Sequence, residues 1–348
     1  MSLKNNTNFN LLQNSRLVIA RSAAKRSDEA ISAGDCFAPS GLAMTARGIF
    51  NALNLRELRQ LIKNALQEDI GCGDITSQII IPKDKRVNAA LLLKEKAIVC
   101  GLDIAREVFR TVDGSIKFQA KAKDGNLEKA GKIIARIQGN ARSILKAERT
   151  ALNLLSHLTG VATLTRRFVD AVKPYKAKIY DTRKTIPGLR VLEKYAVKIG
   201  GGHNHRMGLY DGILIKDNHI ASSVVRSPSS VRVLVEEAKK KMPKGKKLEI
   251  EVINLAEFKE ALKANPDIIM LDNMRINDIK NAVRIRERQS APRLRSGQAR
   301  AQEYKTLIEV SGGVNLDNVR QIAKAGVDII SIGALTHSAK AVDISLEV

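Results

Sequence analysis

Functional side chains recur at the ends of a series of short apolar segments in the second half of the chain. A single charged segment end means little, because strand ends are usually solvated. A succession of them is hard to explain as surface alone, and it predicts one site assembled from several strand ends. In chain order these ends carry Asp181-Thr182-Arg183-Lys184-Thr185, Lys216-Asp217-Asn218-His219, Glu249 with Glu251, Asp272-Asn273, Ser311-Gly312-Gly313 and Ser331-Ile332-Gly333-Ala334.

The last two of these ends are rich in glycine and small residues, and each is followed by a helical pattern. Backbone N–H groups in such a loop can approach a phosphate closely, and a helix N-terminus favours negative charge. An ordinary glycine turn is the alternative interpretation. Because the two loops occur in consecutive units, we expect them to bind phosphate.

Cationic side chains indicate a second kind of anion site. His205 and Arg206 follow a run of glycines and would join Arg183, Lys184 and Lys216. An Arg can bind a carboxylate through two parallel hydrogen bonds, whereas a Lys acts as a point charge. We therefore expect these residues to form a pocket for carboxylates.

The possible metal ligands favour magnesium over zinc. His203 and His205 lie two residues apart on a glycine-rich loop, with no third ligand at helical spacing, which disfavours a zinc site. Glu251 and Asp272 offer carboxylate oxygens that would hold Mg²⁺ or stabilise a developing positive charge. Together the residues predict transfer chemistry on a phosphorylated, polyanionic substrate.

Alternating strands and helices must position these groups. Parallel βα units of this kind fit a βα barrel or an open doubly wound sheet, and no Gly-x-Gly-x-x-Gly supports dinucleotide binding. The expected strands are Lys178–Arg183, Gly212–Lys216, Leu248–Ile253, Asp267–Asp272, Leu307–Ser311 and Val327–Gly333, and the expected helices are Val231–Lys241, Leu255–Ala264, Ile276–Ile285 and Leu316–Ala325.

The rest of the chain divides into three parts. Residues 1–48 show no sustained periodicity, and a disordered extension is expected there. Residues 49–158 read as a mixed α/β domain, with a first helix capped by Asn54 and a long helix beginning near Ser143 and bent at Gly160. Residues 159–348 hold the βα units, and within them 286–305 is expected to be an inserted basic surface loop.

Composition narrows the class of protein. The chain has 348 residues, 44% of them hydrophobic, and no apolar run approaches the roughly 18 residues of a membrane-spanning helix. Three Cys without metal-ligand spacing favour a reduced, cytoplasmic compartment. The net charge of +23 suits nucleic acid or anionic substrates, but 3% aromatic residues and no Trp disfavour single-stranded nucleic acid.

Several motifs occurring in order resemble the quinolinate phosphoribosyltransferase family, from about Asn54 to Val348 apart from the insertion. The motifs are Glu148-Arg149-Thr150-Ala151-Leu152-Asn153, Asp181-Thr182-Arg183-Lys184-Thr185, Gly200-Gly201-Gly202 with Asn204-His205-Arg206, Leu214-Ile215-Lys216-Asp217-Asn218-His219, Glu249-Ile250-Glu251-Val252, Leu271-Asp272-Asn273 and Ser311-Gly312-Gly313.

The resemblance implies a type II phosphoribosyltransferase fold, in which an N-terminal α/β sandwich accompanies an incomplete, seven-stranded βα barrel. The implied reaction joins quinolinate to phosphoribosyl pyrophosphate and gives nicotinate mononucleotide, pyrophosphate and CO₂, a step of de novo NAD biosynthesis. Mg²⁺ would accompany the pyrophosphate. The resemblance also implies a homodimer, or a larger assembly of dimers, in which Arg149 reaches the neighbour's site.

The resemblance assigns roles to individual residues. Catalysis would fall to Glu251, Asp272, Lys184 and Lys216, and the first two are also the expected Mg²⁺ ligands. Glu251 is preferred to Glu249 because it lies nearer the C-terminal end of its strand. Substrate binding would fall to Arg149, Thr182, Arg183, His205, Arg206, Ser311, Gly312, Ser331 and Gly333.

Two other functions remain open at this point. One is a related phosphoribosyltransferase with another acceptor, such as nicotinate alone. The paired cationic groups favour a dicarboxylate, because nicotinate would leave part of that charge unpaired. The other is a basic nucleic-acid-binding protein with a degenerate enzyme core, suggested by the net charge and the Arg-rich segment 286–305.

Overall fold

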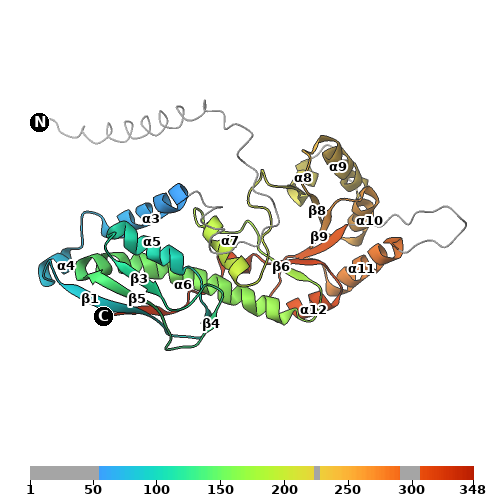
Figure 1. Ribbon diagram of the computed structural model, residues 1–348. Helices are drawn as coiled ribbons and strands as arrows, with labels where there is room; N and C mark the ends of the chain where they lie inside the picture. The colour runs from blue at the N-terminus through green and yellow to red at the C-terminus, as the bar shows by residue number, and fades with distance from the viewer. Residues whose placement is uncertain (1–54, 223–227, 291–305) are drawn as a thin grey trace, which may run out of the picture. The chain divides into compact units, whose positions relative to one another are not determined.

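The computed structural model describes residues 55–222, 228–290 and 306–348 (Figure 1). The extension expected at 1–48 and the proposed cap Asn54 therefore lie outside the described residues. Within the described ranges, no helix combines the length and the apolar character needed to cross a membrane.

The N-terminal region is an antiparallel sheet packed with helices. Its main sheet has the strand order β12-β1-β5-β3, and β2 pairs with β4. Helices α3, α5 and α6 pack against one another and supply the second layer. The elements are α3 (Leu55–Ile70), α4 (Ile75–Ile80), β1 (Arg86–Leu93), β2 (Ala97–Ile98), α5 (Leu102–Val112), β3 (Lys117–Ala120), β4 (Leu127–Glu128) and β5 (Ile133–Asn140).

The end of the chain returns to this N-terminal sheet. Strand β12 (Ile344–Glu347) pairs antiparallel with β1, so that Ile344 lies opposite Leu93 and Glu347 opposite Ala90. The sequence analysis assigned these residues to the barrel range 159–348 and expected no strand there. A four-residue strand carries too little periodicity to be found locally, and its pairing partner lies some 250 residues earlier in the chain.

Helix α6 (Ala141–Ala171) links the two regions. It runs as a single helix through Gly160, where the sequence suggested a bend. A Cβ atom at Gly160 would lie 2.2 Å from the carbonyl oxygen of Lys340. Glycine at this position therefore lets the C-terminal segment pack directly against the helix.

The second region is a parallel sheet with the strand order β6-β11-β10-β9-β8-β7. A parallel bridge between Tyr180 and His203 takes the place of a seventh strand. Among the described residues, no strand pairing connects His203 to β7, so the barrel stays open there. The predicted incomplete βα barrel with an N-terminal α/β domain is thus confirmed. The strands are β6 (Lys178–Tyr180), β7 (Ile213–Ile215), β8 (Leu248–Val252), β9 (Ile268–Asp272), β10 (Leu307–Ser311) and β11 (Ile329–Ser331).

Helices connect these strands as the βα pattern predicts. The helices are α7 (Arg190–Ile199), α8 (Asp217–Ser222), α9 (Pro228–Lys241), α10 (Leu255–Ala264), α11 (Ile276–Ser290), α12 (Val319–Lys324) and α13 (Ala334–His337). Helix α11 extends through 286–290, so the first part of the expected insertion is helical. Its Arg286 is buried and forms an ion pair with Asp328, a contact that the sequence pattern does not reveal. Residues 291–305 lie outside the described part of the chain.

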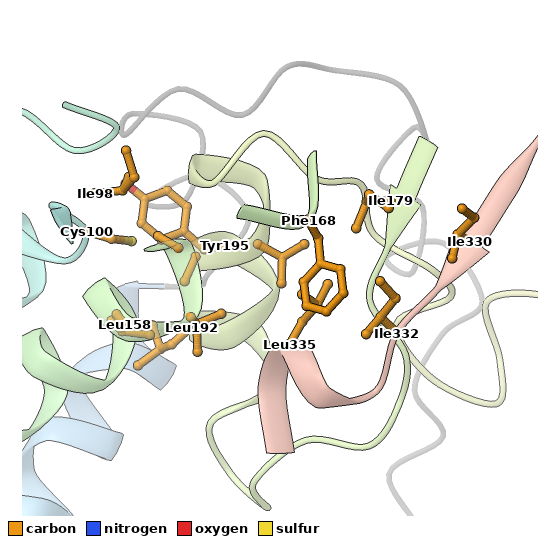
Figure 2. Close-up of a cluster of buried hydrophobic side chains, with 14 of the residues drawn as sticks. Ile98, Cys100, Leu158, Phe168, Ile179, Leu192, Tyr195, Ile330, Ile332 and Leu335 are labelled. Atoms are coloured by element: carbon orange, nitrogen blue, oxygen red, sulfur yellow. The ribbon is translucent and has the colours of Figure 1, made fainter. Parts of the chain in front are cut away.

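One apolar core joins the two regions. Figure 2 shows buried side chains from both, among them Cys100, Leu158, Leu192, Ile179 and Ile330. These residues lie in or beside β2, α6, α7, β6 and β11. Burial of this apolar surface stabilises the loops at the C-terminal ends of the strands by fixing the elements beneath them.

Candidate active site

A cavity of about 750 Å³ lies at the C-terminal ends of the barrel strands. Its volume falls within the range of small-molecule sites. Of the site residues predicted from the sequence, all except Arg149 line this cavity. They are Thr182, Arg183, Lys184, His205, Arg206, Lys216, Glu251, Asp272, Ser311, Gly312, Ser331 and Gly333.

Arg149 lies elsewhere, on helix α6. Its side chain is 62% exposed, and its guanidinium is 3.9 Å from Glu148 Oε1. An exposed Arg away from the cavity of its own chain is compatible with a role in a neighbouring subunit. That role stays a prediction.

Lys216 and Glu251 form an ion pair at the edge of the cavity. The parallel register of β7 and β8 places Ile215 opposite Ile250, so the residues that follow them are neighbours. Lys216 Nζ lies 2.9 Å from Glu251 Oε2, and the Glu251 side chain is buried. The barrel thus holds a carboxylate and an ammonium together beside the space for a substrate.

Asp272 is held by the residue that follows it. Asn273 donates a hydrogen bond from Nδ2 to Asp272 Oδ2 at 2.8 Å, and its backbone N–H donates to the Ser311 carbonyl at 2.9 Å. Asn273 adopts a left-handed φ of 52°, which Asn tolerates better than most residues. The sequence analysis placed Asn273 with Asp272 at this strand end and in a family motif, but gave it no role of its own.

The glycine at 312 is required by this arrangement. Its φ is +87°, and a Cβ atom there would lie 2.3 Å from Asn273 Oδ1. Both the backbone conformation and the close approach therefore exclude a side chain. The loop after β10 and the loop after β9 are locked together at this contact.

A buried aspartate fixes the loop that carries His205 and Arg206. Asp181 accepts hydrogen bonds from Asn204 Nδ2 at 2.6 Å and from the His205 backbone N–H at 2.9 Å, and it also pairs with Lys194. Burial raises the pKa of Asp181 and lowers that of Lys194, while their mutual attraction opposes both shifts. Asp181 thus supports the site without lining the cavity.

Both ring nitrogens of His205 face protein groups. Nδ1 accepts a hydrogen bond from the Arg206 backbone N–H at 2.8 Å, and Nε2 lies 3.0 Å from Glu249 Oε2. Glu309 Oε1 lies 3.7 Å from the same Nε2. Burial works to lower the pKa of His205, but its contact with Glu249 and the charges of both glutamates outweigh that effect and raise it.

These three side chains form a compact cluster on the barrel side of the cavity. One ligand atom from each lies within 4.8 Å of the others, which is close enough to consider a shared metal ion or a shared proton. Burial and the nearby Glu249 charge raise the pKa of Glu309 to about 8. The sequence analysis gave no role to Glu309. A single acidic residue in the middle of a predicted strand does not by itself indicate whether it faces a functional site.

The predicted phosphate loops lie on the same rim. A Cβ atom at Gly333 would lie 2.9 Å from Lys184 Cδ and 3.1 Å from His337 Nε2, so both side chains cover this glycine closely. His337 lines the cavity and was missed by the sequence analysis. Its position one helical turn after Gly333 is the signal that could have found it.

Fold and site together define an α/β-barrel enzyme whose cavity, at the C-terminal ends of the strands, is lined by cationic side chains and glycine-rich loops. Models of the N- and C-terminal domains of quinolinate phosphoribosyl transferase match residues 74–159 and 161–347. The chain therefore belongs to the quinolinate phosphoribosyltransferase family.

The alignment with individual relatives spans nearly their whole length. A probable nicotinate-nucleotide pyrophosphorylase [carboxylating] of Methanocaldococcus jannaschii is 44% identical, covering 83% of this chain and 96% of that protein. The corresponding enzyme of Mycobacterium leprae is 40% identical, covering 83% and 96%. The structure of the nicotinate-nucleotide pyrophosphorylase from Francisella tularensis is similar with a TM-score of 0.73 at 41% identity, covering 84% of this chain and 96% of that one.

Proposed function

We propose that this chain transfers the phosphoribosyl group of phosphoribosyl pyrophosphate to quinolinate and releases pyrophosphate and CO₂, giving nicotinate mononucleotide in de novo NAD biosynthesis. One observation carries the proposal. The same cavity is lined by cationic side chains suited to carboxylates and by the acidic pair Glu251 and Asp272 suited to a developing positive charge. The names of the relatives support the same reaction.

The cationic side chains would bind the two carboxylates of quinolinate. Arg183 and Arg206 line the cavity, and Arg149 of a second subunit would complete the set. Two guanidinium groups can each hold a carboxylate through paired hydrogen bonds and so fix the plane of the ring. That orientation presents the ring nitrogen to the anomeric carbon of the ribose.

The acidic side chains would stabilise the transition state. As pyrophosphate leaves, the anomeric carbon becomes oxocarbenium-like, and Glu251 and Asp272 place negative charge beside it. Lys216 and Lys184 would lie between the acceptor and the phosphoribosyl group. Because Lys216 is paired with Glu251, its charge and position are set before the substrate binds.

The donor set of Glu251 and Asp272 fits Mg²⁺. Both are hard carboxylate donors on neighbouring strands, and Asp272 Oδ1 is not used by the hydrogen bond from Asn273, which goes to Oδ2. When bound, Mg²⁺ would neutralise charge on the pyrophosphate. Magnesium typically keeps water and substrate phosphate ligands, so two protein carboxylates suffice.

The glycine-rich rim would hold the 5′-phosphate. Ser311, Gly312 and Gly333 can offer hydroxyl and backbone N–H groups, and His337 adds a further donor. After transfer, the cationic pyridinium ring accepts the electron pair of the breaking C–C bond as the 2-carboxylate leaves as CO₂. A proton then takes its place on the ring.

A homodimer completes the proposal. Arg149 is exposed, and helix α4 presents Ile75, Ile79 and Ile80 at 67%, 78% and 72% exposure. Such a patch on a short helix is typical of a surface covered by a partner. We propose that a second copy of this chain covers it and that the enzyme works in the cytoplasm, where its thiols at Cys72 and Cys100 stay free.

The experiment is a product assay with two acceptors. The purified chain is mixed with phosphoribosyl pyrophosphate, Mg²⁺ and either quinolinate or nicotinate, and mononucleotide and CO₂ are measured. Quinolinate-dependent formation of both products supports the proposal, and Glu251→Gln should sharply reduce the formation of both. Turnover of nicotinate alone would instead assign the related acceptor, and no turnover by a folded chain would reject the function.

A further inference from the structure

A buried cluster of one imidazole and two carboxyl groups stands behind the cavity. The side chains of His205, Glu249 and Glu309 are 12%, 5% and 0% exposed. They come from the loop after the Tyr180–His203 bridge, from β8 and from β10. Only His205 and Glu309 of these line the cavity, so the cluster adjoins the substrate space without filling it.

The hydrogen bond to Nδ1 fixes the state of the imidazole. A ring nitrogen that accepts the Arg206 N–H carries no proton, so a neutral His205 holds its proton on Nε2. Glu249 Oε2 lies 3.0 Å from this nitrogen, in an ion-pair contact that does not have the angle of a regular hydrogen bond. The ring is therefore held on one side by the Arg206 backbone and on the other by the Glu249 carboxylate.

Glu309 is the third member of the cluster, and it is fully buried. Both of its oxygens, Glu249 Oε1 and His205 Nε2 are buried without a hydrogen bond of regular geometry in the described part of the chain, as is the hydroxyl of Ser331 beside Glu309. Two ionised carboxylates buried beside one neutral imidazole would carry a large desolvation cost. A proton on Glu309 removes one charge and provides an O–H group, and Glu249 Oε1 is an acceptor in the same cluster.

We propose that Glu309 is a neutral acid that donates a hydrogen bond to Glu249, and that this pair positions His205 and, through it, Arg206 for binding the acceptor's carboxylates. Glu309 and Glu249 are positioning residues in this scheme. The inference rests on the proposed function, because the carboxylates are those of quinolinate.

A metal ion is the competing occupant of the cluster. Three ligand atoms within 4.8 Å could hold a divalent cation. Nε2 is the ring nitrogen that faces the two carboxyl groups, and a protonated Nε2 has no lone pair to coordinate a metal. The hydrogen bond at Nδ1 thus favours a proton on Nε2 over a metal ion there. The test below includes metal binding as one of its outcomes.

The kinetic test compares two substitutions of the same buried residue. Glu309→Gln keeps the shape and a donor N–H, so the KM for quinolinate should stay within about twofold of wild type. Glu309→Leu removes the donor and should raise that KM about tenfold, with kcat and the KM for phosphoribosyl pyrophosphate little changed, because ground-state binding of the acceptor is lost. Glu107→Gln is the matched control and should leave the kinetics unchanged, because this carboxylate on α5 is 12% exposed, pairs with Arg59 and does not line the cavity.

The second readout needs no turnover. Nitrogen-15 NMR of histidine-labelled full-length chain, with His205→Asn to assign the signal, should show protonated Nε2 and unprotonated Nδ1 in wild type and in Glu309→Gln. An inactive wild type with this tautomer would reject the proposed function while supporting the cluster. An imidazolium in the wild type, a changed tautomer in Glu309→Gln, or identical kinetics for the Gln and Leu variants would overturn the inference.

Elemental analysis and titration with Zn²⁺ address the metal. Wild type should bind no ion at this cluster. Stoichiometric binding that disappears in Glu309→Gln would overturn the inference in favour of a metal site. If a thermal melt shows that Glu309→Leu is poorly folded, the His205 tautomers of wild type and Glu309→Gln still decide between the proton and the metal ion.

Discussion

Lys216 Nζ lies 2.9 Å from Glu251 Oε2, and the carboxylate is buried while the ammonium is partly exposed. Removal of the lysine therefore leaves a buried charge without its partner. Both side chains also line the cavity, so we expect the pair to affect catalysis as well as stability.

Lys216→Ala should lower kcat by about 10²- to 10³-fold, since a preorganised charge beside the reacting centre is lost. Glu251→Gln should lower kcat much less when it is added to Lys216→Ala than when it is made in the wild type, because the two residues act as a unit. Steady-state kinetics of the two single variants and the double variant measure this coupling. Strictly additive effects would show that the ion pair has no role in the transition state.

Gly312→Ala should destabilise the protein more than a glycine substitution at another left-handed position. The new Cβ meets both an unfavourable φ of +87° and Asn273 Oδ1 at 2.3 Å. Gly131→Ala is the matched control, because its φ is +82° and nothing lies within 4 Å of its Cβ position. Urea unfolding should give a loss of about 1 kcal/mol for the control and about 2–4 kcal/mol for Gly312→Ala. Equal losses would show that Asn273 moves freely.

Glu309 should make the folded state less stable as the pH rises. Burial and the Glu249 charge raise its pKa from an ordinary 4.5 to about 8, so the folded chain keeps a proton that the unfolded chain releases. The stabilisation is complete below about pH 4.5 and is lost as the pH rises toward 8. Relative to wild type, Glu309→Gln should gain on the order of 3 kcal/mol between pH 5 and pH 8. Urea unfolding of both proteins at the two pH values tests this, and a constant difference would contradict it.

Arg149 should act in the partner's site. Arg149→Ala and Glu251→Ala should each be inactive alone, but subunit exchange forms hybrid dimers in which one site has both residues intact. Because random exchange makes half of the dimers hybrid, roughly a quarter of wild-type activity should return. Exchange is verified with differently tagged subunits. Confirmed exchange without recovered activity would place Arg149 outside the partner's site.

The exposed face of helix α4 should support the dimer. Ile79 is 78% exposed in the single chain, so Ile79→Lys should weaken self-association without disturbing the fold of the subunit. Analytical ultracentrifugation measures the association, and circular dichroism checks the fold. Lys63→Glu, on the exposed surface of α3, is the control for a charge change and should leave the dimer intact. A dimer unchanged in both variants would move the interface elsewhere.

Local patterns predicted the barrel elements well. Strand Leu307–Ser311 and helix Leu255–Ala264 have the bounds that periodicity indicated, because side-chain alternation and the 3.6-residue repeat are properties of adjacent residues. The placement of functional residues at strand ends also followed from the sequence, because parallel strands bring those ends to one face. That is why the predicted cavity residues lie together.

Tertiary structure decided what depends on contacts distant in the chain. Strand Ile344–Glu347 forms because it pairs with the edge of β1. The segment alone is too short for its sequence pattern to predict a strand. Asn273, Glu309 and His337 gained their places from residues on other strands and helices. The sequence by itself determined which residues can do chemistry and on which elements they lie. Only the fold decided which of them are buried, which form ion pairs and which line the cavity, because burial and hydrogen-bond partners are set by packing between segments far apart in sequence.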